Sequence, residues 1–184
     1  HTCISDQCAR ADGHGLMPDA VRRVDIAGAC RGRRHASEAI GVFGGSLNCD
    51  FSLAIDVILT VTGRIIVSGM GKSGHIGRKI AATLASTGTP ALFLHPAEAS
   101  HGDLGMVTRA DALLMLSNSG EPAELSELIT YAKRLAIPLT GVANNTDSRQ
   151  CQAFAVALLL PRTQEACPIG RAPTTVTSMM SAVS

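Results

Sequence analysis

Two turns rich in glycine and serine carry the groups in this sequence that are best suited to binding a phosphate. The first turn, at 69–77, follows the apolar run 64–68, and the second, at 117–121, follows the apolar run 112–116. Because a glycine-rich turn between a strand and a helix points backbone N–H groups at an anion, each turn predicts a phosphate contact. Together they predict a small phosphorylated ligand, bound by Gly71, Ser73, Ser117, Asn118, Ser119 and Glu121.

Two other phosphate ligands fit the first turn less well. Gly69, Gly71 and Gly74 have the spacing of a dinucleotide fingerprint, but NAD also needs an acid at the end of the second strand, which here ends in His-Pro at 95–96. The Gly-Lys-Ser sequence at 71–73 is similar to the end of a Walker loop, but the required earlier glycine is Ile66. Neither a dinucleotide nor ATP is therefore the expected ligand, and no cofactor is expected.

The elements that must position these turns alternate along the chain. Apolar runs predict strands at 65–68, 91–94, 112–116, 139–143 and 156–160, and helical patterns follow at 73–86, near 98–104, at 122–135 and near 147–152. A long loop is expected at 161–173. Strands that alternate with helices favour a parallel sheet covered on both faces. The fold class is therefore α/β, a three-layer α-β-α sandwich of flavodoxin type.

The expected strand order is 2-1-3-4-5, and its switch point lies between the first and third strands, where ligands bind at the carboxyl ends. Both phosphate turns follow those two strands. Upstream, residues 47–59 show a helical face made by Leu47, Phe51, Ile55, Ile58 and Leu59, with Asp50 as a cap or first-turn acid and Gly63 closing the helix. We expect an N-terminal segment at 1–45, helical but with no clean period, and a phosphate-binding domain at 46–184.

Composition restricts the class of protein and its partners. The chain has 184 residues, 46% hydrophobic and 17% charged, with a formal net charge of +1, which is typical of a globular domain and favours neither nucleic acid nor a membrane surface as a partner. The arginines between 22 and 34 are interleaved with acids, as on a solvated helix face. The six cysteines, at 3, 8, 30, 49, 151 and 167, form no Cys-x-x-Cys pair, so we expect reduced thiols, a cytoplasmic protein and no metal site.

Several longer stretches are similar to one family. They lie at 69–77, 82–90, 95–106, 117–121 and 165–175, and the similarity spans roughly residues 47–177. They resemble the sugar isomerase (SIS) domain of bacterial D-arabinose-5-phosphate isomerases. The Ser-His-Gly-Asp-Leu-Gly sequence at 100–105 and the Glu-Ala-Cys-Pro-Ile-Gly sequence at 165–170 separate this branch from SIS domains in general.

The resemblance implies an aldose–ketose isomerase that interconverts D-ribulose 5-phosphate and D-arabinose 5-phosphate through an enediol, for lipopolysaccharide or capsule synthesis. The positions that match the family's catalytic residues are Lys72, His101, Glu124 and Glu165, and Thr174 lies in a matching substrate-binding stretch. Lys72 would polarise substrate oxygens, and His101 would open the sugar ring or polarise the carbonyl. Glu165 would move the proton, with Glu124 as the other candidate base. Glu124 fits equally well as a polar-face residue of its helix.

The resemblance also implies a homotetramer whose sites draw on neighbouring subunits. Family chains continue beyond 177 with a long apolar helix that carries a further histidine, and many add a pair of CBS domains, so we expect this sequence to stop within that helix. Two alternatives remain open. One is a regulatory SIS domain that binds a sugar phosphate without turnover, and the other is an isomerase of a different ketose phosphate.

Overall fold

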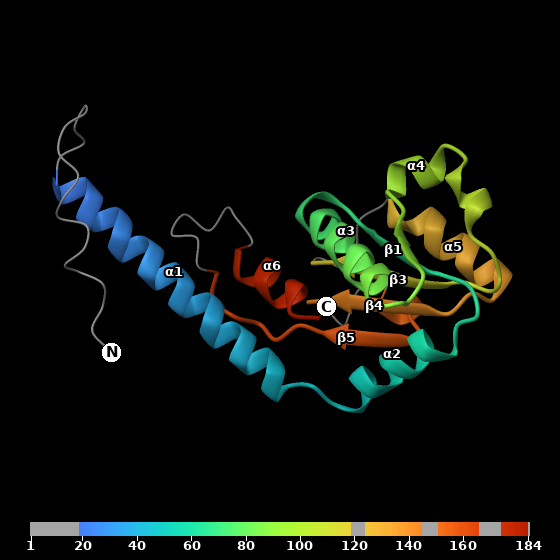
Figure 1. The fold of residues 1–184 in the computed structure, drawn as a ribbon, viewed down its shortest axis with the longest axis horizontal. Coiled ribbons are helices and arrows are strands. Elements are labelled where there is room, and N and C mark those ends of the chain that lie inside the picture. The colour runs from blue at the N-terminus through green and yellow to red at the C-terminus, as the bar shows by residue number, and fades with distance from the viewer. Residues whose placement is uncertain (1–18, 119–123, 145–150, 166–173, 184) are drawn as a thin grey trace.

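The computed structural model describes residues 19–118, 124–144, 151–165 and 174–183. Their strands form one parallel sheet in the order β2-β1-β3-β4-β5, which confirms the predicted topology (Figure 1). The strands are β1 Ile65–Gly69, β2 Ala91–Phe93, β3 Ala112–Ser117, β4 Leu139–Ala143 and β5 Val156–Leu159.

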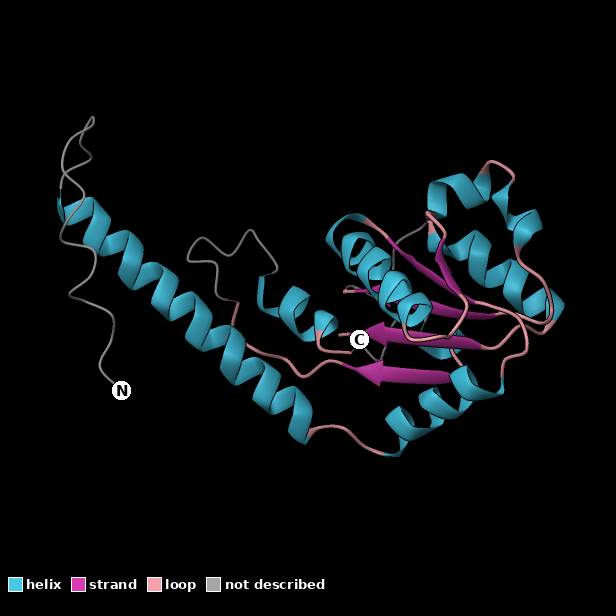
Figure 2. Cartoon of the chain, in the orientation of Figure 1, coloured by secondary structure: helices cyan, strands magenta, loops and turns pink. Residues whose placement is uncertain are grey.

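Helices cover both faces of this sheet (Figure 2). They are α1 Asp19–Gly45, α2 Cys49–Thr60, α3 Gly71–Ser86, α4 Pro96–Ser100, α5 Leu125–Leu135 and α6 Thr174–Ser181, with short 3₁₀ turns η1 Asp103–Met106 and η2 Cys151–Ala153. The N-terminal half of α1 extends away from the sheet, as Figure 1 shows. The predicted α-β-α layers are therefore present.

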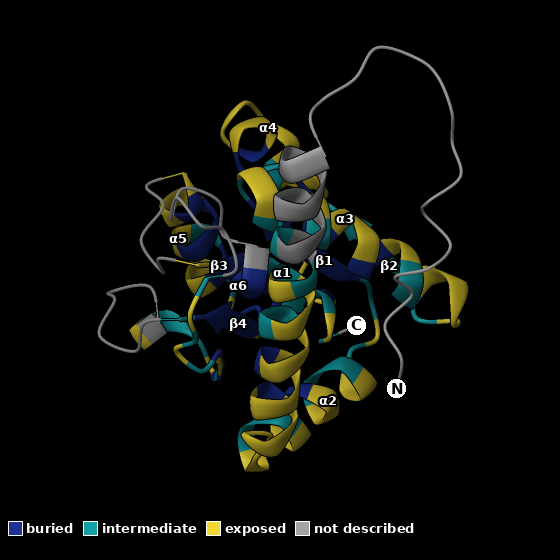
Figure 3. Cartoon of the chain, turned by 90° about the vertical axis from the view of Figure 1, so that its left-hand side faces the viewer, coloured by how far each residue is buried: buried dark blue, intermediate teal, exposed yellow. Residues whose placement is uncertain are grey.

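The period-2 alternation of the strands divides the core into two clusters. Val67 and Leu114 face the layer made by α1, α2, α3 and α6, whereas Ile66 and Met115 face α4 and α5. Figure 3 shows the buried strands between more exposed helices. Because both faces are covered, β1, β3 and β4 are buried at every position, which explains why their sequences are mostly apolar rather than alternating.

Helix α2 differs from the prediction in its end and its buried face, whereas Asp50 is its first-turn acid, one of the two roles predicted for it. Asn48 is the N-cap, and its side chain accepts a hydrogen bond from the backbone N–H of Asp50. The helix ends at Thr60, and Gly63 does not close it. Instead, Gly63 donates its N–H to the carbonyl of Ala110, and it lies so close that a Cβ would be 2.6 Å from the Ala110 oxygen.

The predicted apolar face of α2 was only partly right. Phe51 and Ile58 pack against the core, but the fully buried residue is Ala54. Leu47, Ile55 and Leu59 are exposed, Leu59 by 74%. The reason is that the helix meets the sheet through a narrow stripe, which leaves a second apolar stripe uncovered.

Other element ends shift by a few residues. The helix expected near 98–104 is split into α4 and η1, with Gly102 between them at a φ of 126°. Residues 119–123, 145–150 and 166–173, which include parts of the predicted helices at 122–135 and 147–152 and of the loop at 161–173, lie outside the described residues. Within the described ranges no single helix is long and apolar enough to cross a bilayer, although Cys30–Gly45 and α2 pass that test together with an 82° bend between them.

Candidate functional site

The turn from β1 to α3 is built on close approach between backbones. A Cβ on Gly74 would lie 2.6 Å from the carbonyl oxygen of Gly69, and a Cβ on Gly69 would lie 2.9 Å from the carbonyl oxygen of Leu116. Gly71 has a φ of 53°, in the left-handed region that favours glycine. Sterics thus explain the first predicted glycine turn, and they place the start of α3 directly over the end of β1.

The first turn of α3 presents its backbone donors without a side-chain cap. Met70 is the N-cap and makes no side-chain hydrogen bond to the helix. Lys72 is exposed beside these N–H groups. The Ser73 hydroxyl lies 3.6 Å from the Met180 sulfur of α6. Uncapped N–H groups, the positive end of the helix dipole and a lysine together suit a phosphate.

The second predicted turn begins at the same height of the sheet. Gly69 of β1 is in register with Leu116 of β3, so the two carboxyl ends are neighbours. Ser117 is buried and Asn118, next in the chain, is exposed. Ser119 and Glu121 lie outside the described residues, as does the side chain of Thr174. The start of the first turn and the described start of the second turn therefore lie next to each other, at the predicted switch point. The roles of the individual residues there stay predictions.

His101 and Glu124 stand exposed at helix ends. His101 is the C-cap of α4, and its backbone N–H donates to the carbonyl of Glu98. Glu124 occupies the N-cap position of α5 but makes no capping hydrogen bond. The His95 Nδ1 accepts a hydrogen bond from the N–H of Ala97 and thereby caps α4. No group of three or more His, Cys, Asp or Glu side chains that would suit a metal ion occurs among the described residues.

Glu165 has a structural partner that sequence reasoning missed. Its carboxylate accepts hydrogen bonds from the backbone N–H groups of Thr175, at 2.8 Å, and Val176, at 3.3 Å. It therefore caps the first turn of α6 from ten residues upstream. The sequence signal for this cap was an acid upstream of a Thr-Thr pair that begins a helix. It was missed because ten residues separate Glu165 from Thr175, whereas capping residues normally adjoin the helix.

Helix α6 connects Glu165 with the phosphate turn. Glu165 caps its first turn, whereas Met180 near its other end contacts Ser73. At 1.5 Å per residue, the five residues from Thr175 to Met180 advance the axis by about 8 Å. Helix α6 therefore contacts the acid near its start and the phosphate turn near its end.

Asp111 is the carboxylate whose pKa departs most clearly from its ordinary value in the described part of the chain. Burial acts to raise the pKa, but hydrogen bonds from the backbone and hydroxyl of Thr108 and from Arg64 outweigh it and lower the pKa below 3.8. Asp111 precedes β3, at the edge of the sheet opposite the two turns. It fastens the loops there and belongs to the fold rather than to the candidate site.

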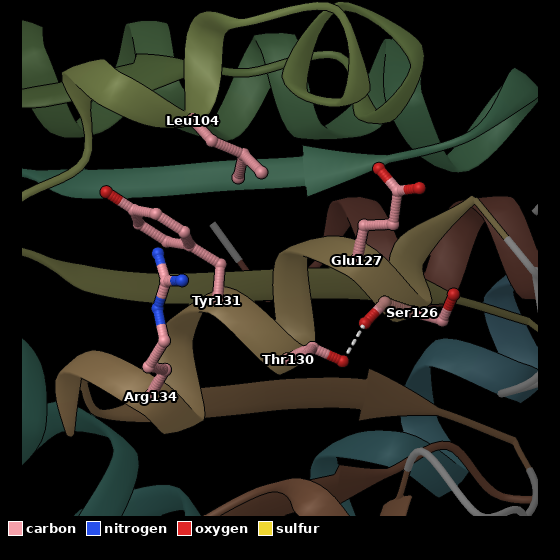
Figure 4. Close-up of a pocket in the computed structure, with 6 residues that line it drawn as sticks. All are labelled: Leu104, Ser126, Glu127, Thr130, Tyr131 and Arg134. Carbon is pink, nitrogen blue, oxygen red and sulfur yellow. Dashed lines mark hydrogen bonds between the residues drawn. The ribbon is translucent and has the colours of Figure 1, made fainter.

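A groove of about 380 Å³ lies on the outer side of α5 (Figure 4). Tyr131 and Arg134 lie next to each other on one side of it, with the guanidinium 5.3 Å from the ring centre, and Glu127 stands apart from them. None of the predicted site residues is among the six that line it, which are Leu104, Ser126, Glu127, Thr130, Tyr131 and Arg134. The groove is therefore separate from the candidate site.

Comparison with known proteins supports the resemblance to the SIS domain family that the sequence motifs indicated. The sequence model of the SIS domain matches residues 58–184. The chain is 50% identical over 132 residues to arabinose 5-phosphate isomerase KdsD of Escherichia coli K12 and 53% identical over 130 residues to that of Pseudomonas aeruginosa. These matches cover 72% and 71% of this chain but only 40% of each relative, so the chain spans less than half the length of those proteins.

Solved structures give the same picture. An E. coli CFT073 protein in complex with arabinose 5-phosphate superposes with a TM-score of 0.82 at 32% identity, covering 91% of this chain and 89% of that one. A sugar-phosphate isomerase candidate from Listeria monocytogenes gives 0.84 at 26% identity, covering 92% and 87%. The sheet order and these matches lead to one conclusion: this chain belongs to the SIS domain family.

Proposed function

We propose that this chain carries the catalytic domain of an isomerase that interconverts D-ribulose 5-phosphate and D-arabinose 5-phosphate. The observation that carries the proposal is the register of β1 and β3, which makes the starts of the two phosphate turns neighbours. Lys72 lies in the first of these turns. Relatives named arabinose 5-phosphate isomerase at about 50% identity support the choice of substrate.

The phosphate is proposed to bind at the start of α3. Backbone N–H groups there lack a side-chain cap, and Ser73 offers a hydroxyl. From β3, Ser117 and Asn118 would contribute, followed by Ser119 and Glu121. Lys72, which is exposed at the start of α3, would bind and polarise the sugar oxygens. Thr174 would contact the sugar from α6.

The proton transfer is assigned to Glu165, with Glu124 as the other candidate. Starting from the ketose, the carboxylate removes a proton from C1 and the C2 carbonyl oxygen gains a proton, which forms an enediol. The protonated side chain exchanges its proton with solvent and delivers a proton to C2 while the C1 hydroxyl loses its own, which leaves the aldose. His101 or Lys72 would stabilise the charge that develops on the oxygens. No redox cofactor enters this balance.

The position of Glu165 supports this assignment. Both carboxylate oxygens accept hydrogen bonds from backbone N–H groups, so the side chain is fixed. Helix α6 sets its separation from the phosphate turn. A fixed base at a set distance from a phosphate is what a reaction at the far end of a short sugar requires.

The test is isomerisation in D₂O, followed by NMR. Turnover of D-ribulose 5-phosphate through an enediol gives D-arabinose 5-phosphate with deuterium at C2. The Glu165→Gln variant would lose at least a hundredfold in kcat, and Glu127→Gln on the exposed face of α5 serves as the matched control. Ligand binding without any product would contradict the isomerase and favour a regulatory sugar-phosphate-binding domain. Turnover of another ketose phosphate in preference would replace the substrate.

The proposal includes a homotetramer, a cytoplasmic location and supply of a sugar for lipopolysaccharide or capsule. Self-association is supported by apolar side chains exposed on or beside α1 and α2, which are Ile40, Val42, Leu47, Leu53, Ile55 and Leu59. We assign the sugar-phosphate site to 46–184 and subunit contact to the exposed apolar side chains of α1 and α2. Light scattering of the wild type against Leu59→Glu tests this, because a charge in a buried interface would dissociate the subunits.

A further inference from the structure

The His-Pro pair at 95–96 has no part in the proposed reaction, yet its histidine is held in one orientation. The Nδ1 atom of His95 accepts a hydrogen bond of 3.2 Å from the backbone N–H of Ala97. A ring nitrogen that accepts a hydrogen bond carries no proton, so the neutral ring has its proton on Nε2. The side chain thereby caps α4, in which Pro96 occupies the first turn, where its missing N–H costs nothing.

The backbone that leads into His95 is fixed by β1. The N–H of Leu94 donates to the carbonyl of Val67 at 2.9 Å, and the carbonyl of Leu94 accepts a hydrogen bond of 2.8 Å from the hydroxyl of Ser68. Ser68 is completely buried. The phosphate turn begins at Gly69, the next residue along β1. The entry to α4 and the entry to the phosphate turn therefore share one buried anchor.

Contacts at its start fix the direction of α4. The rings of Phe93 and His95 meet edge to face, with 6.4 Å between their centres. Pro96 and Ala99 are buried beneath the helix. A helix of five residues has too few internal hydrogen bonds to be stable alone, so its place depends on its cap and its packing. Because α4 ends at His101, the position of that residue depends on the side chain of His95.

We propose that His95 is a positioning residue that acts through His101. This inference rests on the proposed function, in which His101 opens the sugar ring or polarises the carbonyl. With the cap in place, α4 holds His101 at the edge of the sheet where the phosphate turn begins. Loss of the cap lets the first turn of α4 fray and moves His101 away from the sugar, but it leaves the phosphate turn unchanged. The expected signature is a lower kcat at an unchanged KM.

Three substitutions of His95 in the full chain test the role of Nδ1. The side-chain oxygen of asparagine can occupy the place of Nδ1, and asparagine is a strong N-cap, whereas glutamine reaches the place of Nε2 and supplies no cap. His95→Asn should keep kcat within about threefold of the wild type. His95→Gln and His95→Ala should lose about ten- to a hundredfold in kcat, and KM should stay within about threefold in all three variants.

Other patterns among the three variants would reject the proposal. If His95→Gln kept its activity while His95→Asn lost it, His95 would act on the substrate directly through Nε2. An unchanged kcat in all three variants would leave His95 without a role in turnover. Asn48→Ala is the matched control, because it removes the cap of α2. It should lower Tm by about 2–4 °C, as loss of the α4 cap should, and leave kcat within about threefold.

A double-mutant cycle tests whether His95 acts through His101. In a His101→Ala background there is no imidazole left to position, so adding His95→Ala should lower kcat by less than about twofold. A residue that acts independently would instead cause its full ten- to hundredfold loss again, and that result would contradict the proposal.

Hydrogen exchange at the Ala97 amide, followed by NMR, tests the cap without any measurement of activity. The amide should exchange about tenfold more slowly in the wild type and in His95→Asn than in His95→Gln or His95→Ala. Equal rates in all four proteins would mean that His95 does not cap α4. A slowly exchanging amide in a wild type that does not turn over D-ribulose 5-phosphate would reject the isomerase, and with it the positioning role, but not the cap.

Discussion

The carboxylate of Glu165 accepts a hydrogen bond of 2.8 Å from the backbone N–H of Thr175 and so closes the start of α6. The first N–H groups of a helix have no partner within the helix, and a negative charge there is favoured by the helix dipole. The residue proposed to move the substrate proton therefore also holds the fold. These two roles predict different effects of substitution.

Changes at Glu165 separate the structural role from the chemical one. Glu165→Gln keeps an oxygen that accepts one of the N–H groups, so the unfolding free energy should fall by less than about 1 kcal/mol while kcat falls at least a hundredfold. Glu165→Ala removes the cap as well and should cost about 1–2 kcal/mol. Urea unfolding and the isomerase assay measure the two effects.

Asn48→Ala provides the matched control for a lost cap. Asn48 caps α2 with one side-chain hydrogen bond, so its loss should cost about 1 kcal/mol and leave kcat within threefold. Were Glu165→Gln to keep full activity, Glu165 would be a cap only, and Glu124 would become the candidate base.

Lys72 should affect the substrate and not the fold. Its side chain is exposed at the start of α3 and makes no hydrogen bond or ion pair within the described residues, so Lys72→Met should leave the unfolding midpoint unchanged. Loss of its charge should lower kcat/KM at least a hundredfold. Lys133→Met, in the last turn of α5, is the control and should keep its activity. Equal losses in both variants would argue against a site at α3.

Gly74 should be intolerant of even a methyl group. In most helices Gly→Ala stabilises, but here the new Cβ would meet the Gly69 carbonyl at 2.6 Å and push α3 off β1. Gly74→Ala should therefore cost about 1–3 kcal/mol and weaken sugar-phosphate binding. Gly41→Ala, on α1 with nothing within 4 Å of the new methyl, should stabilise by about 0.5–1 kcal/mol. Thermal unfolding measures both variants, and we expect Tm to fall for Gly74→Ala and to rise for Gly41→Ala.

The centre of the sheet was predictable because β1, β3 and β4 are buried on both faces. Apolar runs such as 112–116 have no other interpretation in a small α/β chain, and the two glycine turns locate the switch point. The exposed stripe of α2 was not predictable. Leu59 has the hydropathy of a core residue but is 74% exposed, because hydropathy does not tell whether the chain's own sheet or another surface covers a residue.

The candidate site was predictable only in part for a related reason. Lys72 and Ser73 sit in a local motif, and strand order brings Ser117 near them. The cap made by Glu165 joins residues ten apart through a path that has no periodic signal. Contacts of this kind are determined by the tertiary fold and leave no local pattern in the sequence.

Asp111 should make the stability of the fold depend on pH in acid. It is 2% exposed and accepts hydrogen bonds from Thr108 and Arg64, and these hold its pKa below the ordinary value of 3.8 against the opposing effect of burial. A carboxyl whose pKa is lowered by folding stabilises the folded state above its unfolded pKa. That contribution is lost as the pH falls from 3.8 through the folded pKa. The unfolding free energy should therefore decline over this range.

Asp111→Asn should remove most of that pH dependence and lower the unfolding free energy by about 2–3 kcal/mol at neutral pH. The reason is that the new amide NH₂ would face N–H groups that donate hydrogen bonds to the carboxylate in the wild type. Asp56→Asn, exposed on α2, controls for the general titration of carboxylates and should keep the wild-type slope. Urea unfolding at pH 7, 5, 4 and 3 measures both slopes. A variant that declines as steeply as the wild type would place the acid sensitivity elsewhere and leave Asp111 with only a hydrogen-bonding role.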